Sequence, residues 1–449
     1  MKINIFKIFI FSLAFAGYGQ AEAMDLTEAL ATAYRNNPTI KAERARLKAT
    51  DEALPQAYSG WMPTLSADYS KGRENEKLGT NPESRILPST KKLSLNQPIF
   101  SGGETLASIN RAKNQIKAAR ARLDATEQQI MLEAVTAYVD VVRAREVLQL
   151  SEHNEKVLTE QLTATKDRFD LGETTTTDVA QSESRLARAQ SDRIDAEGNL
   201  IIANSEFRRV FGITTPAEMA MPDVMEDVPE AGFNKAMEEA ITDNPLLISA
   251  QYDAASAENN ISIRKSDILP TVDLRGEISR SDELSSSLSA SHIESESITV
   301  NVAIPLFQSG SEYSRVRQAK REAEDLKFKL AQTKEDVVNE FTQAWRNIQT
   351  ARGNIKATKA SVDAAKIALE GVRQEQLVGS RTILDVLDAE QELFTSQVQN
   401  VTAIRNGVVS IYRLKSALGK LTAQSMGLEV ELFDPKEHYE NVKYKMIGF

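Results

Sequence analysis

The chain of 449 residues contains one pattern twice, at a fixed offset of 207 positions. Pro38 and Pro245 form the first matched pair, and each follows an Asn. The same offset, with no insertion or deletion, relates Pro63 to Pro270, Pro98 to Pro305, Phe100 to Phe307, Gly103 to Gly310, Lys113 to Lys320, Gly172 to Gly379, Asp178 to Asp385 and Gly212 to Gly419. A repeat of this length predicts two copies of one unit with the same order of elements.

The offset places the boundaries of the units. We expect repeat 1 at 24–226, a linker at 227–231, repeat 2 at 232–421 and a C-terminal tail at 422–449. Residues 1–23 are set apart because two Lys precede a short apolar stretch and a small-x-small site, the pattern of a secretory signal peptide. No apolar run reaches the ~20 residues of a membrane-spanning helix. A mature chain that enters a membrane would therefore use β-strands.

Composition excludes several classes of protein. The absence of Cys excludes a disulfide framework, a thiolate metal site and a cysteine nucleophile. A net charge of −10, without a block of Lys and Arg, argues against nucleic-acid binding. His153, His292 and His438 are expected on a long helix, in a loop and in the tail, so they predict no shared metal site. We expect no cofactor, and no constellation of residues indicates an enzyme.

A long helix is predicted in each unit, over 103–170 and 310–377. Apolar or small residues recur there at alternating spacings of three and four, which is typical of a coiled-coil seam. At ~1.5 Å per residue each helix would be a rod of about 100 Å, which needs packing partners along its length. The seam positions are Ile109, Ala112, Ile116, Ala119, Leu123, Thr126 and Ile130 in the first unit and Val316, Ala319, Ala323, Leu326, Leu330, Thr333 and Val337 in the second.

Each rod is expected to end in a tip, at 171–178 and at 378–385, and to reverse. Gly172 and Gly379 suit the left-handed position that follows a helix end. Capping boxes fit the starts of the return helices, with Thr175 and Asp178 in one unit and Thr382 and Asp385 in the other. The return helices then run to about residue 211 and residue 418, so each unit contains a helical hairpin.

Strands are predicted at about 63–70, 91–98, 270–279 and 296–305, where apolar residues alternate with polar ones. Such alternation is what a water-filled transmembrane barrel requires, although a pair of half-buried hairpins in a soluble domain fits the periodicity equally well. Trp61 and Tyr69 could belong to an aromatic girdle or be packed surface residues. At the corner between strand and helix, Ser101 and Glu104 are expected to form a capping box.

Four strands are too few to close a barrel wide enough for an aqueous channel. Three chains would supply about twelve strands and would bury the helical seams between their hairpins. The predicted fold is therefore an α+β membrane protein, with long α-helical coiled-coil hairpins forming an α-barrel and a β-barrel completed by trimerisation. The number three is a geometric preference.

These features resemble the TolC family of outer-membrane efflux and secretion ducts. The resemblance covers nearly the whole mature chain, and its most specific part is the run from Val378 to Ala389, followed by a helix that ends at Leu418 and Gly419. The tail, with Leu432 to Pro435, looks like that of members serving type I secretion. The resemblance implies a homotrimer in the outer membrane with a large periplasmic portion. It also implies docking to an inner-membrane transporter through a periplasmic adaptor, a membrane fusion protein, and no catalysis by the duct.

The resemblance also implies a gate at the tips. Arg381 would help to hold the periplasmic entrance closed by pairing with Thr177 and Asp178 of a neighbouring hairpin, while Asp385 and Asp388 would line the constriction. Because the last two lie on one helix face, three chains would form a carboxylate ring that favours cations. Asp178 and Asp385 could instead be plain helix caps.

The charge of this gate is confined to the second tip. Arg381 and Asp388 correspond to Thr174 and Gln181 in the first unit, so helix capping does not explain them. Gln376 stands five residues before the Arg, where family members often have a Tyr tether, and it could still donate a hydrogen bond. The hairpin tips around Gly172 and Gly379 are expected to face the adaptor.

The sequence thus predicts a passive outer-membrane exit duct of a tripartite efflux pump or type I secretion system, in contact with outer-membrane lipid. The alternative is a periplasmic coiled-coil adaptor or scaffold without a pore. That protein would share the hairpins and the secretion signal, but it would not need an amphipathic strand pair in each unit. A polar, acidic tunnel suits drugs, metal ions and unfolded polypeptides alike, so the substrate stays open.

Overall fold

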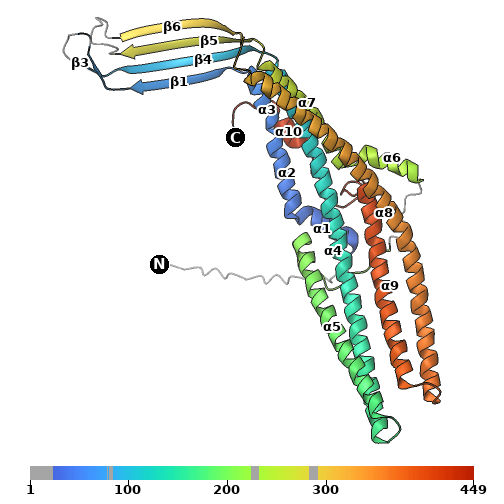
Figure 1. Cartoon of the computed structure of the whole chain (residues 1–449). Helices are drawn as coiled ribbons and strands as arrows, with labels where there is room; N and C mark the ends of the chain where they lie inside the picture. Colours follow the sequence, from blue (N-terminus) through green and yellow to red (C-terminus); the bar gives the residue numbers. More distant parts are fainter. Residues whose placement is uncertain (1–23, 78, 80–83, 224–231, 283–291, 449) are drawn as a thin grey trace, which may run out of the picture.

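The computed structural model describes residues 24–77, 79, 84–223, 232–282 and 292–448, so the expected signal peptide and the linker at 227–231 lie outside the described residues. Its helices are α1 (Leu26–Asn36), α2 (Pro38–Asp51), α3 (Ala53–Tyr58), η1 (Ser59–Trp61), α4 (Glu104–Asp170), α5 (Thr176–Phe211), α6 (Phe233–Asp243), α7 (Pro245–Ser266), α8 (Ser311–Leu377), α9 (Ile383–Ala417) and α10 (Glu437–Val442). Its strands are β1 (Thr64–Lys71), β2 (Glu74–Glu76), β3 (Ser84–Ile86), β4 (Ser89–Ser101), β5 (Thr271–Asp282) and β6 (His292–Ala303). The molecule is elongated, with a sheet at one end and two helical tips at the other (Figure 1).

The main sheet is antiparallel and has the order β1-β4-β5-β6. Its central pair, β4 and β5, joins the two units, because Leu93 of the first lies opposite Ile278 of the second. β4 is longer at both ends than the expected strand at 91–98. The short hairpin of β2 and β3 was not expected, since its polar segment lacks the alternation that signals a strand.

The two faces of the main sheet differ in polarity. Leu65 on β1 and Ile298 on β6 are 69% and 85% exposed, and the half of their face nearer the helices is apolar, whereas Arg280 pairs with Glu294 toward the far end of the strands. On the other face Lys92 forms an ion pair with Glu277 across β4 and β5, at 2.7 Å. The strands therefore have an apolar face that is open to the surroundings and a polar face with internal pairing.

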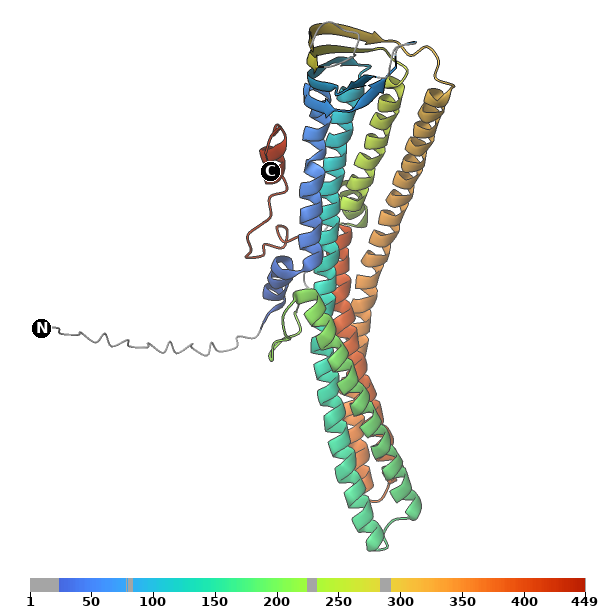
Figure 2. The ribbon, with the colours of Figure 1, turned by 90° about the vertical axis from the view of Figure 1, so that its left-hand side faces the viewer.

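The helices form two layers end to end. Near the sheet, α4 packs between α2 and α7, and α7 packs on α8; toward the tips, α4 packs between α5 and α9, and α9 packs on α8. Figure 2 shows α4 and α8 extending over most of the length of the molecule, while the shorter helices each run along a part of it. Within the described ranges, no helix combines the length and the apolar character that crossing a membrane requires.

The two predicted seams are buried to different extents. The seam of α4 is buried at six of its seven positions, including Ile109 and Ile116, whereas Val316 and Leu326 on α8 remain partly exposed. The cause is the position of α8 at the edge of both layers, where its long partners are α7 and α9 and only the short helix α6 adds a further contact. The edge helices also carry highly exposed apolar side chains, such as Ile201 on α5 and Phe328 on α8.

The largest core lies at mid-height, where α1, α4, α5 and α9 meet. Tyr138, Phe207 and Phe211 are fully buried there, and the two Phe rings stack with centroids 4.1 Å apart. The Tyr138 hydroxyl donates to the carbonyl of Met24 at 2.7 Å. This core fixes Met24, the first described residue, against the middle of the long helix α4.

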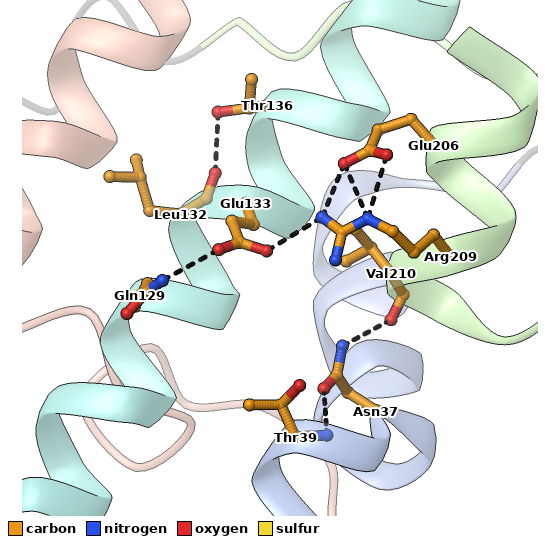
Figure 3. Close-up of polar contacts among 9 residues, drawn as sticks. All are labelled: Asn37, Thr39, Gln129, Leu132, Glu133, Thr136, Glu206, Arg209 and Val210. Atoms are coloured by element: carbon orange, nitrogen blue, oxygen red, sulfur yellow. Dashed lines mark hydrogen bonds and ion pairs between the residues drawn. The ribbon is translucent and has the colours of Figure 1, made fainter. Parts of the chain in front are cut away.

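Equivalent Asn residues hold the same junction in both units. The Asn37 side-chain amide donates to the Val210 carbonyl at 2.9 Å, and its oxygen accepts from the Thr39 N–H at 2.9 Å (Figure 3). Asn244 reaches the Ala417 carbonyl at 3.5 Å across the same sequence separation. Each Asn therefore starts a helix and also satisfies the end of a return helix.

The corner between β4 and α4 differs from the expected capping box of Ser101 and Glu104. Gly103 is the N-cap of α4, with a φ of +84° and no side-chain cap. Ser101 remains in the sheet, where it lies opposite Thr271. The prediction was wrong because the strand continues up to the corner and leaves the cap position to a glycine in the left-handed region.

The C-terminal tail packs along the outer side of α2 and α4. The Arg44 guanidinium lies over the rings of Tyr34 and Phe433, and that of Arg120 lies over Tyr439. Nδ1 of His438 lies 3.3 Å from a carboxylate oxygen of Asp51. The tail is thus attached by contacts between residues nearly 400 positions apart in the sequence.

Candidate functional site at the hairpin tips

Both hairpin tips lie at the end of the molecule opposite the sheet, in both views of the ribbon (Figures 1 and 2). The first turn joins α4 to α5 and the second joins α8 to α9. Most residues of the two turns, Leu171 to Asp178 and Val378 to Asp385, are exposed. Thr174, Asp178 and Asp385 are half-buried, and Ile383 alone among them is buried, where it anchors the second turn. The tips are therefore accessible surfaces on rigid supports.

Glycine sets the geometry of each turn. Gly172 and Gly379 have φ values of +77° and +80°, the left-handed conformation that both were expected to adopt. The Glu173 N–H donates to the Arg168 carbonyl and the Ser380 N–H to the Glu375 carbonyl, both at 2.9 Å. These are the bonds of a Schellman motif, so both tips end their helices in the same way.

Capping boxes begin both return helices, which confirms the helix-cap role of Asp178 and Asp385. Asp385 accepts from the hydroxyl of Thr382 at 2.7 Å and from its N–H at 2.9 Å. Hydrogen bonds with Thr382 lower the pKa of Asp385, and those with Thr174 and Thr175 lower that of Asp178. Both carboxylates are therefore charged at neutral pH, and the capping role does not remove their charge.

Arg381 is paired within its own tip. Its Nε donates to a carboxylate oxygen of Glu375 at 2.8 Å, and its Nη1 lies 3.9 Å from Asp385. Thr177, one of its expected partners, is exposed at the first tip. Gln376 is half-buried, and its backbone carbonyl accepts from the Gly379 N–H. Glu375, six residues before the Arg and across the turn, was not among the predicted site residues.

Asp388 joins the two hairpins of the chain. Its carboxylate accepts from the guanidinium of Arg185, so α9 is connected to α5 within the first three turns of both return helices. Arg185 was not among the predicted site residues, although the repeat carries a signal for it. Arg185 lies four residues after Gln181, the repeat equivalent of Asp388, and thus on the same helix face.

Each hairpin is also closed by an internal ion pair at equivalent positions. Lys166 lies 2.8 Å from Glu183 in the first hairpin, and Arg373 pairs with Glu390 in the second. The two pairs are related by the repeat offset. The duplicated pairs hold each hairpin, whereas the unduplicated pair of Arg185 and Asp388 holds the hairpins to each other.

The three histidines lie on three different elements and form no cluster. His153 lies on α4 and His438 on α10, whereas His292 is the first residue of β6 rather than part of a loop. Among the described residues no group of three or more His, Asp or Glu is placed to hold a metal ion. The charged residues of the tips therefore remain the candidate functional site.

An amphipathic sheet, carried on long helical hairpins that end in charged tips, defines the class of outer-membrane ducts. The family model for outer membrane efflux proteins matches residues 29–212 and 236–420, one match in each unit. The chain belongs to this outer membrane efflux protein family. It is an outer-membrane protein with a large periplasmic portion, and the predicted resemblance to the TolC family is confirmed.

Individual relatives cover almost the whole chain. The chain is similar to outer membrane efflux protein BepC of Brucella suis, with 31% identity over 96% of this chain and 93% of BepC. It is 26% identical to outer membrane protein TolC of Escherichia coli, over 93% of this chain and 87% of that protein. The fold matches the crystal structure of the CmeC outer membrane channel of Campylobacter jejuni, with a TM-score of 0.79, 16% identity and coverage of 99% and 98%.

Proposed function

We propose that three copies of the chain form a passive exit duct, in which the sheets close a β-barrel in the outer membrane and the hairpins form a periplasmic α-barrel. The observation that carries this proposal is the position of the open edges. β1 and α2 lie at one edge of the chain, and β6 and α8 lie at the other. Each copy can thus offer one edge to the next, which closes a ring of about twelve strands.

The exposed apolar side chains support the same arrangement. On the sheet they lie on the face opposite the polar one, so that in a closed barrel they could contact lipid while the polar face lines the interior. On the helices they lie on α5 and α8, the edge elements that a neighbouring copy would cover. A single chain leaves both sets in water, whereas a trimer in a membrane buries both.

The gate is proposed at the second tip. Arg381 would exchange Glu375 for Thr177 and Asp178 of the first tip of the adjacent chain when the entrance closes, with Gln376 donating a further hydrogen bond. Asp385 and Asp388 would form the carboxylate ring of the constriction. Both carboxylates lie on one face at the start of α9, which supports this assignment.

The tips around Gly172 and Gly379 are proposed to dock to a periplasmic adaptor that connects the duct to an inner-membrane transporter. Their exposure and regular Schellman geometry suit a docking surface. BepC is named as an efflux protein, and we propose that this chain likewise provides a route for efflux or for type I secretion, with no catalysis of its own.

The test is the single-channel conductance of the purified protein in planar bilayers. Wild type should conduct with cation selectivity, and the double variant Asp385→Ala, Asp388→Ala should lose that selectivity because it removes the carboxylate ring. A wild type that never conducts, even with Arg381→Ala added to loosen the tip, would contradict the duct.

A matched control removes the same number of charges near the other tip. Asp167 and Asp170 lie at the end of α4, three residues apart and exposed. Asp167→Ala, Asp170→Ala should keep most of the cation selectivity. An equal loss in both double variants would show that selectivity arises from total charge and not from the second tip.

A further inference from the structure

The C-terminal end of the chain forms one wall of an apolar groove. The groove has a volume of about 890 Å³ and lies between the α3–η1 segment and residues 443–447. Its aromatic and apolar lining includes Tyr58, Trp61, Met62, Tyr444, Met446 and Ile447. The Tyr58 ring lies between two others, with centroids 6.1 Å from Trp61 and 5.9 Å from Tyr444.

The last residues of the tail carry apolar side chains that are exposed, although the tail directly before them is packed on the helices. Ile447 is 93% exposed, Tyr444 is 69% exposed and Met446 is 64% exposed. Directly before them, Val442 is buried and Tyr439 packs on the cluster around Leu54. The tail is therefore docked up to Val442, and its last residues present an apolar surface to the surroundings.

The groove lies where the helices meet the sheet. Trp61 ends η1, and β1 begins at Thr64. Figure 1 shows the C-terminus beside α3, just below the start of the strands. With the sheet across the outer membrane, this level corresponds to the boundary between the periplasm and the leaflet that faces it.

The composition of the groove matches such a boundary. Aromatic rings with one polar atom are favoured at membrane interfaces, and Lys side chains extend from apolar surroundings toward phosphate. Lys443 and Lys445 line the groove beside Tyr444. The Lys443 ammonium donates one of its three N–H groups to the carboxylate of Glu440.

We propose that this groove binds a phospholipid of the leaflet that faces the periplasm, with an acyl chain along Trp61 and Met446 and the phosphate near Lys443 and Lys445. Continuity favours lipid over another occupant, because the groove adjoins the first residues of β1, whose Leu65 belongs to the exposed apolar face of the sheet. The C-terminal residues thereby anchor the helical portion of the duct to the membrane surface. This inference rests on the proposed function, since it requires the sheet to lie in the membrane.

Single-cysteine spin labels test this placement, because the chain has no Cys of its own. Ile447→Cys reports on the groove, Ile298→Cys on the apolar face of the sheet, and Glu437→Cys is the matched control at an exposed position ten residues earlier in the tail. Each protein is reconstituted in vesicles of phosphatidylethanolamine and phosphatidylglycerol. Power saturation then compares collisions with oxygen, which concentrates in lipid, and with a water-soluble nickel chelate.

The expected result is an oxygen-to-nickel ratio several-fold higher at 447 than at 437, and close to that at 298. A ratio at 447 that equals the control would overturn the inference. Exclusion of both colliders at 447, with dipolar broadening between labels, would show that a second copy fills the groove instead. If position 298 also favours nickel, the sheet is not in the membrane and the proposed function itself fails.

Fluorescence gives an independent measurement. Trp61 and Trp345 are the two Trp residues of the chain, so Trp345→Phe leaves Trp61 as the single emitter. Brominated phospholipid should quench Trp61, and the double change Tyr444→Ser, Met446→Ser should reduce that quenching because it removes one wall of the groove. Unchanged quenching would show that contact between Trp61 and lipid does not depend on the last residues of the chain, and it would overturn their anchoring role.

Discussion

The guanidinium of Arg185 on α5 donates to the carboxylate of Asp388 on α9, and this ion pair joins the two hairpins of one chain just above their tips. Both residues lie outside the duplicated pattern, since their repeat equivalents are Glu392 and Gln181. The connection is therefore specific to the contact between unlike hairpins.

Loss of this ion pair should loosen the entrance. Arg185→Ala and Asp388→Asn should each raise the open probability of single channels, because a partly exposed pair contributes about 0.2–1 kcal/mol in each chain. The charge exchange Arg185→Asp, Asp388→Arg should restore the wild-type value. Arg188→Ala, an exposed Arg on the same helix, is the control, and an effect as large as that of Arg185→Ala would contradict a specific pair.

Truncation of Asn37 should destabilise the mid-height junction. Asn37→Ala leaves the buried Val210 carbonyl without its donor, so the free energy of unfolding should fall by about 1–3 kcal/mol. Urea unfolding of the detergent-solubilised protein measures this loss. Asn36→Ala, at the exposed neighbouring position, should change the midpoint little, and Asn244→Ala should repeat the effect in the second unit.

The Asp51 carboxyl should make stability depend on pH. Its side chain is 1% exposed beside His438, and burial raises its pKa above 3.8 despite the opposing effects of His438 and Arg120. The folded protein therefore holds this proton more tightly than the unfolded chain. Stability should fall as the pH rises from 3.8 to the raised pKa, and level off above it.

The variant Asp51→Asn should remove that dependence. Urea midpoints of both proteins across the acidic range give the measurement, and the difference between the two curves isolates this carboxyl from other titrating groups. His438→Ala removes a partner that lowers the Asp51 pKa, so the falling part of the curve should extend to higher pH. Parallel curves for wild type and Asp51→Asn would show that Asp51 has the same pKa in both states.

The second tip should depend on the backbone of Gly379. Its φ of +80° is unfavourable for Ala, so Gly379→Ala should destabilise the turn by about 1 kcal/mol. Faster hydrogen exchange of the Ser380 amide, which bonds the Glu375 carbonyl, would report the change. Gly371→Ala, inside α8 with open space around the added carbon, should instead slow exchange locally, because Ala is the better helix former.

Repeated, periodic and local patterns of the sequence predicted most of the elements of this fold. The 207-residue offset and the three-four spacing indicated hairpins, and Thr382 with Asp385 indicated where the second one restarts. These features are local or periodic, so they are visible before any tertiary contact forms. The Ser101 cap was wrong because continued pairing of β4, a tertiary effect, decided that corner.

The missed contacts depend on which helices become neighbours. Arg185 and Asp388 meet because α5 packs near α9, and Arg44 meets Phe433 because the tail folds back along α2. Neither juxtaposition has a periodic signature. The rotation of each helix about its axis, which selects the facing residues, follows from packing of the whole bundle and not from a single segment.

The pairing of β4 with β5 determines when the sheet can form. Ser89 contacts Asp282 across 193 positions of sequence, so the central pair of strands must wait until most of the chain has emerged from the secretion machinery. Contacts this distant slow folding, and in a single chain both outer strands, β1 and β6, then present unpaired backbone groups. If the chain forms the proposed trimer, an unassembled copy would be prone to aggregation, and its biogenesis would depend on keeping it soluble in the periplasm until it meets the other copies.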